Sequence, residues 1–228
     1  MSLSEQFYSA FIKNNRWQLY LQGLGKTIEV TFFAAMLGLV LGTIACLLNM
    51  QRSRTGKRTV LSGIAYIYID VIRGTPTMIQ LLIMWNVIMA ASKNKILVAS
   101  LAFGINSGAY VAEIIRGGIQ SVDPGQMEAG RSLGLTRIMT MKSIILPQAF
   151  KNCFPSLLNE FITLLKETSI AGAVGLAELT HASDQISSAT FSYLMPLMGA
   201  AVMYFAVVKF LSLVFGKVEK KLRESDNR

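Results

Sequence analysis

Apolar residues in this sequence are gathered into runs that are long enough to cross a lipid bilayer, with short polar segments between them. A bilayer-spanning helix needs about 20 mostly apolar residues. The expected spans are residues 27–50, 60–90, 96–115, 154–174 and 193–215, and Gly216 can end the last one. The pattern therefore predicts an all-α membrane protein with five transmembrane helices in a single domain over residues 1–228.

Small and polar residues interrupt these runs. In the first run, Gly38 and Gly42 are four residues apart and form a stripe suited to close helix packing. The polar or helix-breaking residues are Asp70, Arg73, Gly74 and Pro76 in the second run, Asn106, Ser107 and Glu113 in the third, and Asn159, Glu160, Lys166 and Glu167 in the fourth. A charge at the centre of a bilayer costs about 3 kcal/mol or more, so each charged residue needs a cavity or a partner.

Composition supports a membrane protein and changes how the charge is interpreted. Hydrophobic residues make up 52% of the chain and charged residues only 15%, which is more apolar than a soluble domain of this length needs. A formal net charge of +9 could indicate a nucleic-acid partner. The basic residues lie between the apolar runs rather than on one helix face, so we expect lipid contact and no nucleic acid.

The basic residues also predict the orientation. One side of the predicted membrane would carry Arg52, Arg54, Lys57, Arg58, Arg116, Arg131, Arg137, Lys142, Lys151, Lys217, Lys220, Lys221, Arg223 and Arg228. The other side would carry Lys13, Arg16, Lys26, Lys93 and Lys95. Cytoplasmic loops hold the excess of Lys and Arg, so the N-terminus is expected outside and the C-terminus in the cytoplasm.

The remaining segments suggest no catalytic or metal site. Residues 1–20 are expected at the membrane interface, and residues 178–190 are expected to form a polar loop in which His181 is solvated. His181 is the only histidine and has no second ligand at metal spacing. Cys46 and Cys153 are expected to be small packing residues near the cytoplasm, where a disulfide is disfavoured.

The fourth run is predicted to break at Lys166-Glu167-Thr168-Ser169. A helix broken inside a membrane frees backbone N–H and C=O groups, which need a cavity, water or a ligand. Freed N–H groups suit a carboxylate and acidic side chains suit an ammonium, so a zwitterionic amino acid would satisfy both. The alternative is an ion pair of Lys166 or Glu167 that only fixes the packing.

Polar residues on the third and fourth runs could extend this path. Asn159 and Glu160 precede Lys166 and Glu167 by seven residues, so each pair shares one helix face. Glu160 could instead pair with Lys151 or Arg116. Asn106 and Ser107 offer hydrogen bonds either to a solute or to the protein core.

Between the third and fourth runs lies a polar insert, residues 119–150. Asp123 can cap a helix with Pro124 as its first residue and Gln126 at the capping-box position, and Gly134 should end that helix. Thr136 can cap a second helix to about Ile145, with Pro147 ending it. Ala129 and Gly130 would give the first helix a flat side on which another protein's backbone can lie.

The same insert resembles the EAA loop of ABC-importer permeases. Glu128-Ala129-Gly130, then Gly134, then nine residues, then Ile144-Ile145-Leu146-Pro147 keeps every spacing of that loop. The one departure is Gly130 in place of the second alanine. The resemblance implies that Glu128, Ala129, Gly130, Gly134, Ile144, Leu146 and Pro147 belong to a coupling helix that docks on a cytoplasmic ATPase. From the residues alone, without the resemblance, an amphipathic interfacial helix with no partner is an equally good interpretation of this insert.

A second signature narrows the family. Residues 70–76, DVIRGTP, followed by Gln80, resemble the acidic-x-x-Arg-Gly-Thr-Pro pattern of the polar-amino-acid branch of these permeases. Residues 110–120, YVAEIIRGGIQ, are similar to that branch as well. Pro76 is expected to kink the second helix and Asp70 to neutralise Arg73 from one turn away. Asp70, Arg73, Gly74 and Pro76 could then serve gating or only the structure.

The resemblance implies the rest of an importer. The expected partners are a second permease copy or paralogue, two cytoplasmic ABC ATPase subunits, an extracytoplasmic amino-acid-binding protein, the amino acid itself and membrane lipid. The sequence has no Walker A pattern, so ATP and Mg would be used by the ATPase and not bound by this chain. The expected location is a bacterial inner membrane, and the acidic residues in the spans favour polar amino acids, cationic or neutral, as cargo.

Three other classes compete with this interpretation, and one is a non-transporting assembly or sensor subunit, which would copurify with an ATPase but show no cargo flux. A stand-alone ion-coupled secondary transporter or channel could use Glu160, Lys166 and Glu167 for ions, and gradient-driven uptake without an ATPase would identify it. An intramembrane enzyme is disfavoured, because the sequence has one histidine and no Gly-x-Ser-x-Gly pattern.

Overall fold

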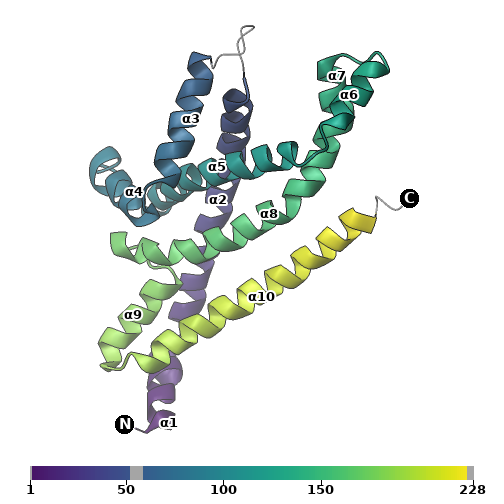
Figure 1. Ribbon diagram of the computed structural model, residues 1–228. Helices are drawn as coiled ribbons and strands as arrows, with labels where there is room; N and C mark the ends of the chain where they lie inside the picture. Colours follow the sequence, from purple (N-terminus) through teal and green to yellow (C-terminus); the bar gives the residue numbers. More distant parts are fainter. Residues whose placement is uncertain (1, 52–58, 225–228) are drawn as a thin grey trace. The chain divides into compact units, whose positions relative to one another are not determined.

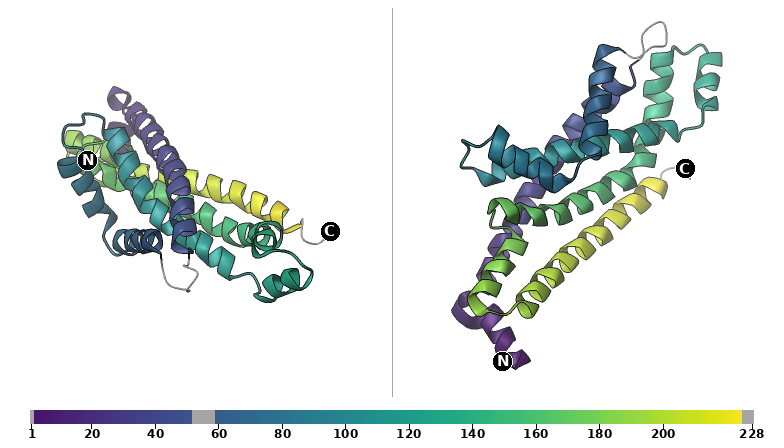
Figure 2. Two further views of the ribbon diagram at one scale, coloured as in Figure 1. Left: turned by 90° about the horizontal axis from the view of Figure 1, so that it is seen from above. Right: turned by 60° about the vertical axis from the view of Figure 1, so that its left-hand side comes forward.

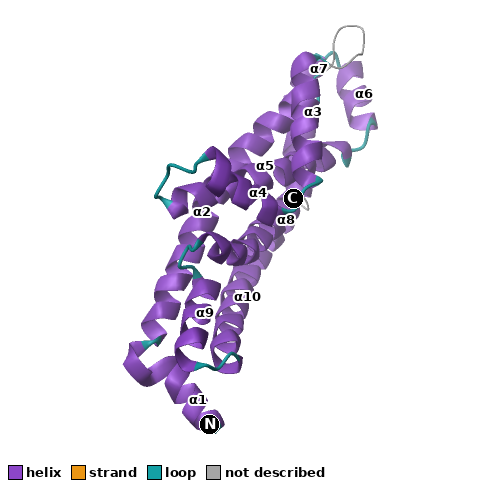
Figure 3. Cartoon of the chain, turned by 90° about the vertical axis from the view of Figure 1, so that its left-hand side faces the viewer, coloured by secondary structure: helices purple, strands orange, loops and turns teal. Residues whose placement is uncertain are grey.

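The structure is a computed structural model that describes residues 2–51 and 59–224 (Figure 1). Two further views of the ribbon are given in Figure 2. Within the described residues the chain forms helices and loops and no strand (Figure 3). The predicted all-α fold is confirmed for that part of the chain. Arg52, Arg54, Lys57, Arg58 and Arg228, used above for the orientation, lie outside it.

The helices follow one another along the chain with few long connections. They are α1 (Leu3–Phe7), α2 (Trp17–Asn49), α3 (Val60–Arg73), α4 (Thr77–Ile83), α5 (Lys95–Gln120), α6 (Gly125–Ser132), α7 (Arg137–Thr140), α8 (Leu146–Glu167), α9 (Leu179–Thr190) and α10 (Leu194–Glu224). Short π-helical turns occupy Tyr8–Ile12, Met84–Ile88 and Met141–Ile145, and 3-10 turns occupy Lys13–Asn15 and Thr168–Val174.

Some of these helices have the length and composition of membrane spans. Among the described residues, α2, α5 and α10 each contain a long apolar stretch that could cross a bilayer. The broken pair α3 and α4 makes a fourth candidate if it is one span. The expected fourth run lies on α8, which carries Lys151, Glu160, Lys166 and Glu167 and is less apolar. The count of five spans therefore stays a prediction.

The first long helix begins at Trp17, so the C-terminal part of the expected interfacial segment is helical. Two other predictions were wrong. Gly216 does not end α10, which continues to Glu224. Residues 178–190 form helix α9 rather than a polar loop, and His181 lies in its first turn.

Packing divides the chain into two compact units. The first comprises Met1–Leu37, Thr75–Gly104 and Ile162–Ser212, and the second comprises Gly38–Gly74, Ile105–Phe161 and Leu213–Arg228. In the first unit the largest buried side chains include Leu81, Phe103 and Leu164, each at most 1% exposed. A second cluster of this unit gathers around Tyr20, whose hydroxyl donates to the carbonyl of Pro196 at 3.3 Å.

In the second unit, α2 and α5 approach each other closely at glycines. A Cβ atom placed on Gly38 would lie 3.0 Å from Ser107 Cβ, and one on Gly42 would lie 2.6 Å from Val111 Cβ. Small residues let helix backbones approach in this way in a membrane. The predicted packing stripe of Gly38 and Gly42 is therefore confirmed.

Candidate functional site

The polar insert forms two short helices joined by a tight turn, and its local signals act much as predicted. Asp123 Oδ1 accepts a hydrogen bond from the Gly125 N–H at 2.8 Å, and α6 begins at Gly125, one residue later than expected. At the other end, Gly134 has a φ of +84°. Thr136 caps α7 by accepting a hydrogen bond from the Met139 N–H at 3.2 Å.

The turn between α6 and α7 satisfies the last carbonyls of α6. The Leu135 N–H donates to the Gly130 carbonyl at 3.1 Å, and the Gly134 N–H donates to the Arg131 carbonyl at 3.0 Å. This pair of bonds is the Schellman arrangement, in which a residue with positive φ ends a helix. Gly134 is therefore placed where only glycine adopts the backbone without strain.

The predicted role of Pro147 was wrong. A π-helical turn, Met141–Ile145, joins α7 to α8, and α8 begins at Leu146. Pro147 therefore lies in the first turn of α8 instead of ending the preceding helix. The helical backbone runs on through this point, so Pro147, which has no N–H, is accommodated directly after a π-helical turn rather than at a free helix end.

The two faces of the α6–α7 hairpin differ. Gly130 is buried, and a Cβ there would lie 2.6 Å from Thr140 Cγ2, so its small size serves the hairpin's own packing. Glu128 and Ala129 are exposed. Two large apolar side chains, Leu133 and Ile138, are 82% and 80% exposed. Leu146 and Pro147, from the same family pattern, are exposed as well, whereas Ile144 is half-buried.

The predicted path residues on the third and fourth runs are partly brought together. Ser107 Oγ donates a hydrogen bond to Glu160 Oε1 at 2.8 Å, within the second unit. Asn106 and Ser107 are both buried, at 2% exposure, whereas Asn159 is exposed. The alternative pairing of Glu160 with Arg116 is not observed, because Arg116 contacts Glu113 and Gln120 instead.

At the predicted break the fourth run changes from an α-helix to a 3-10 helix. Helix α8 ends at Glu167, and a 3-10 helix, Thr168–Val174, follows and ends at Gly175 with a φ of +70°. Lys166 is exposed, Glu167 and Ser169 are half-buried, and Thr168 is buried with its hydroxyl donating to the Leu165 carbonyl. Lys166 and Glu167 take part in none of the ion pairs found among the described residues.

Sequence reasoning missed two residues in this region. Lys95 Nζ, at the start of α5, donates a hydrogen bond to the Gly175 carbonyl at 2.7 Å and so satisfies one of the freed backbone groups. Glu178 caps α9 and is fully buried. No local pattern identifies Lys95 as a partner, because Gly175 lies 80 residues away.

The Glu178 carboxylate accepts three hydrogen bonds. Its donors are the Thr180 and His181 N–H groups, each at 2.7 Å, and the Tyr204 hydroxyl at 3.0 Å. Burial raises the pKa of Glu178 above its ordinary value, and these donors act in the opposite direction. The sequence offered little sign of this cap, because the preferred N-cap residues are Ser, Thr, Asp and Asn.

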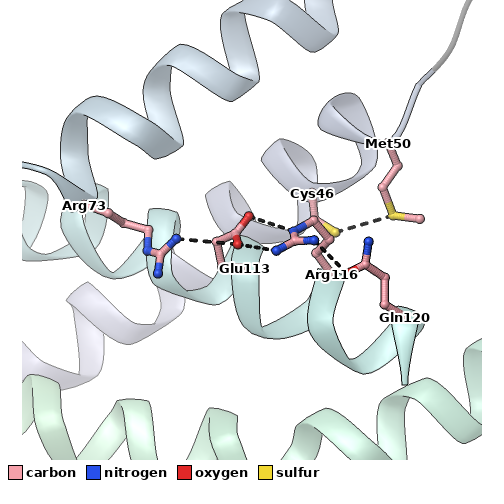
Figure 4. A network of polar contacts seen from close by, with 6 residues as sticks. All are labelled: Cys46, Met50, Arg73, Glu113, Arg116 and Gln120. Carbon is pink, nitrogen blue, oxygen red and sulfur yellow. Dashed lines mark hydrogen bonds and ion pairs between the residues drawn. The ribbon is translucent and has the colours of Figure 1, made fainter. Parts of the chain in front are cut away.

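The second predicted span breaks where expected, but its charges pair differently. α3 ends at Arg73, and Gly74, Thr75 and Pro76 separate it from α4. The predicted pairing of Asp70 with Arg73 was wrong. Arg73 Nη1 lies 3.5 Å from Glu113 Oε2 of α5, and Arg116 binds the same carboxylate (Figure 4).

A cavity of about 780 Å³ lies beside this charged cluster in the second unit. Asp70, Arg73, Glu113, Arg116 and Arg137 are among the residues that line it. Three guanidinium groups and two carboxylates thus face one space. Sequence spacing could not place Arg137 there, because it comes from α7, beyond the turn at Gly134.

The described residues form bilayer-length helices, a helix pair broken before Pro76 and helices with buried polar groups, which are features of a polytopic membrane transport protein. The chain belongs to the family of binding-protein-dependent transport system inner membrane components, which matches residues 34–224. The resemblance to ABC-importer permeases drawn from the EAA pattern is thereby confirmed. The protein is a membrane-embedded transport subunit and not an enzyme.

Characterised relatives and a solved structure agree with this assignment. The chain is 37% identical over 209 residues to the arginine transport system permease protein ArtQ of Bacillus subtilis, covering 90% of this chain and 93% of that one. It is 36% identical over 205 residues to the putative glutamine transport system permease protein GlnP of Rickettsia typhi, covering 89% and 92%. It also matches the crystal structure of an amino acid ABC transporter with histidines, with a TM-score of 0.83, 41% identity and coverage of 90% and 94%.

Proposed function

We propose that this chain is the permease subunit that moves polar amino acids, including cationic ones, into the cell at the expense of ATP hydrolysed by a partner. The observation that carries the proposal is the 41% identity, over 90% of the chain, to the permease of a solved amino acid ABC transporter. The arginine and glutamine permeases among the relatives support the same cargo class. The family assignment gives no support to a stand-alone ion-coupled transporter or channel.

The proposed partners are two cytoplasmic ABC ATPases, a second permease copy or paralogue, and an extracytoplasmic amino-acid-binding protein. The α6–α7 hairpin, within residues 119–150, is the proposed docking element for the ATPase. Its exposed Leu133 and Ile138 support this, because large exposed apolar side chains in contiguous patches mark interaction surfaces. ATP and Mg would bind to the partner, and this chain would bind neither.

The proposed cargo path uses polar groups on the third and fourth spans. Ser107 and Glu160 already contact each other, and α8 gives way to a 3-10 helix at Thr168, where the proposed path would offer backbone groups to a carboxylate or ammonium. Asn106 and Asn159 are the further candidates. In the proposed topology of five spans, the N-terminus is outside and the C-terminus is in the cytoplasm.

Reconstitution tests this function directly. The permease would be placed in proteoliposomes with its ATPase and binding protein, and uptake of radiolabelled arginine and glutamine would be followed with and without ATP. ATP-dependent uptake is expected. Uptake that needs only an ion gradient, and no ATPase, would contradict the proposal and support the secondary-transporter alternative.

A variant pair links uptake to the cargo path. Glu160→Gln should lower uptake about tenfold or more, because the acceptor bound to Ser107 loses its charge, while the ATPase still binds. Glu219→Gln, at a carboxylate on α10 far along the chain from the path residues, is the control. Wild-type uptake in Glu160→Gln would remove Glu160 from the path.

A further inference from the structure

We propose that Glu113 is a positioning residue for transport, which holds Arg73 at the C-terminal end of α3 and thereby fixes the point where the second span breaks. The inference rests on the proposed function, because the process that it serves is ATP-driven uptake. Glu113 is not placed in the cargo path. It acts through Arg73, and Arg116 orients it.

The Glu113 carboxylate makes a close contact with Arg116 and a longer one with Arg73. Arg116 binds it with two donors, Nε to Oε1 at 2.9 Å and Nη2 to Oε2 at 2.6 Å. A bidentate guanidinium–carboxylate pair of this kind fixes orientation as well as adding energy. Arg73 approaches Oε2 at 3.5 Å from α3 (Figure 4). Since Arg116 and Glu113 lie one turn apart on α5, their pair orients the carboxylate, and the Arg73 contact is the one that joins two helices.

Arg116 and Arg73 each make a further contact with a residue of α5. Arg116 Nη1 donates to Gln120 Oε1 at 2.7 Å, so the guanidinium is held at both ends. The Arg73 guanidinium lies 5.5 Å from the centre of the Tyr110 ring, which is also on α5. A cation over an aromatic face is attracted to it, and the attraction is larger where water is excluded. α5 thus offers both a carboxylate and a ring to the last residue of α3.

The Arg73–Glu113 contact lies at the end of a helix, where it can affect the break that follows. It is the last residue of α3, and the break before α4 follows directly. The Gly74 N–H still donates to the Asp70 carbonyl at 2.9 Å, but Pro76 has no N–H and cannot continue the ladder of α3. The contact between Arg73 and Glu113 therefore holds the last turn of α3 at the place where its ladder stops.

The cluster also shares its cavity with the α6–α7 hairpin. Arg137, the first residue of α7, lines the same space as Arg73, Glu113 and Arg116. A movement of the hairpin would change the charge and water around the Glu113 carboxylate. The polar cavity is thus the structural link between the proposed docking element and the broken span.

The test measures cargo taken up per ATP hydrolysed by the complete transporter in proteoliposomes. Glu113→Gln and Arg73→Gln should each lower this ratio about tenfold, while ATPase binding and basal hydrolysis stay within about twofold of wild type. Arg73→Lys keeps the charge and should recover the ratio to within about threefold. The double variant should be no worse than Glu113→Gln alone, because that change already removes the contact with Arg73 together with the Arg116 pair.

Glu29→Gln is the matched control, since it breaks a second ion pair, Lys26–Glu29 at 2.8 Å, on another helix. Its ratio should equal that of wild type. If the Gln variants lose thermal stability or assembly but keep the wild-type ratio, or if their effects add in the double variant, the positioning role is overturned and the proposed function stands. If the wild-type assembly hydrolyses ATP without taking up amino acids, the proposed function fails and the inference fails with it.

Discussion

At the scale of single residues, Gly42 shows how closely two helices of the second unit approach. A Cβ there would lie 2.6 Å from Val111 Cβ and 2.7 Å from the Gly108 carbonyl oxygen. Gly42→Ala should destabilise the protein by about 1–2 kcal/mol, because overpacking outweighs the roughly 1 kcal/mol by which Ala favours a helix. The thermal unfolding midpoint of the purified permease would measure the loss.

Gly63→Ala provides the comparison, because a Cβ at Gly63 of α3 meets nothing within 4 Å. That variant should unfold at or above the wild-type temperature. If the two alanine variants behaved alike, the close approach at Gly42 would not be a source of stability.

Glu178 leads to a prediction about pH. Its carboxyl has an ordinary pKa of 4.5, and burial raises the pKa in the folded protein. As pH rises above about 4.5, the unfolded chain releases this proton first, so the free energy of unfolding falls until the raised pKa is passed. Glu178→Gln cannot titrate, so its unfolding midpoint should depend less on pH over about pH 4 to 8.

The measurement compares slopes rather than absolute stabilities, because glutamine also loses one of the acceptors that cap α9. Asp184→Asn, at an exposed position of the same helix, is the control and should keep the wild-type slope. An unchanged slope in Glu178→Gln would show that ionisation of this carboxyl does not affect folding.

These residues also mark what a sequence can and cannot reveal. The spacing of Gly38 and Gly42 is local, and it predicted the helix contact correctly. Arg73 and Glu178 each have a partner on a distant helix: Glu113 lies on α5 and Tyr204 on α10. A sequence lists the charges that need partners but not which helices the fold places beside them, so Asp70 was wrongly paired with Arg73.

At the scale of elements, the α6–α7 hairpin carries the proposed docking surface. Replacing both Leu133 and Ile138 with serine should weaken ATPase binding by about 2–4 kcal/mol while the hairpin stays folded, because both side chains are about four-fifths exposed. Co-purification of the ATPase and ATP-driven uptake would both fall. Circular dichroism and thermal unfolding of the permease alone should not change.

Gly130→Val is the contrasting change in the same hairpin, because its side chain would collide with Thr140. It should destabilise the permease itself as well as weaken the complex. Full ATPase binding by the double serine variant would place the docking surface elsewhere on the chain.

Helix ends that are set by capping residues or glycine nearby in the sequence were predicted well. Helix α9 and the junction of α7 with α8 were not. Gly134 and Thr136 bound the two short helices as expected, whereas α6 begins one residue later than the expected cap at Asp123 implied. α9 was taken for a loop because it is polar, yet its buried positions Leu179, Ala182, Ser183, Ile186 and Ser187 follow a helical period. Two of these are serines, so an apolar stripe was not visible. The continuation of α7 into α8 depends on a π-helical turn, for which the sequence carries no clear signal.

At the scale of the whole molecule, the two recognisable patterns were enough to identify the family, which matches residues 34–224. The number of spans is harder to read, because α8 holds both charges and a proline. A helix that lines a polar path needs fewer apolar residues than one that faces lipid on all sides. The polar residues that make α8 a candidate for the cargo path thus also make it hard to recognise as a span.

Topology is decided by the side from which each loop can be labelled. With five spans and the N-terminus outside, the α6–α7 hairpin is cytoplasmic and α9 is on the outer side. Ser132→Cys on α6 and Ser188→Cys on α9 place single thiols at exposed positions, while the native Cys46 and Cys153 are only 1% and 6% exposed. In right-side-out vesicles a membrane-impermeant maleimide should label Ser188→Cys and spare Ser132→Cys, and inside-out vesicles should show the reverse. Labelling of the hairpin from outside would put it beyond the reach of a cytoplasmic ATPase and overturn its docking role, and labelling of both thiols from one side would exclude the single span predicted between the hairpin and α9.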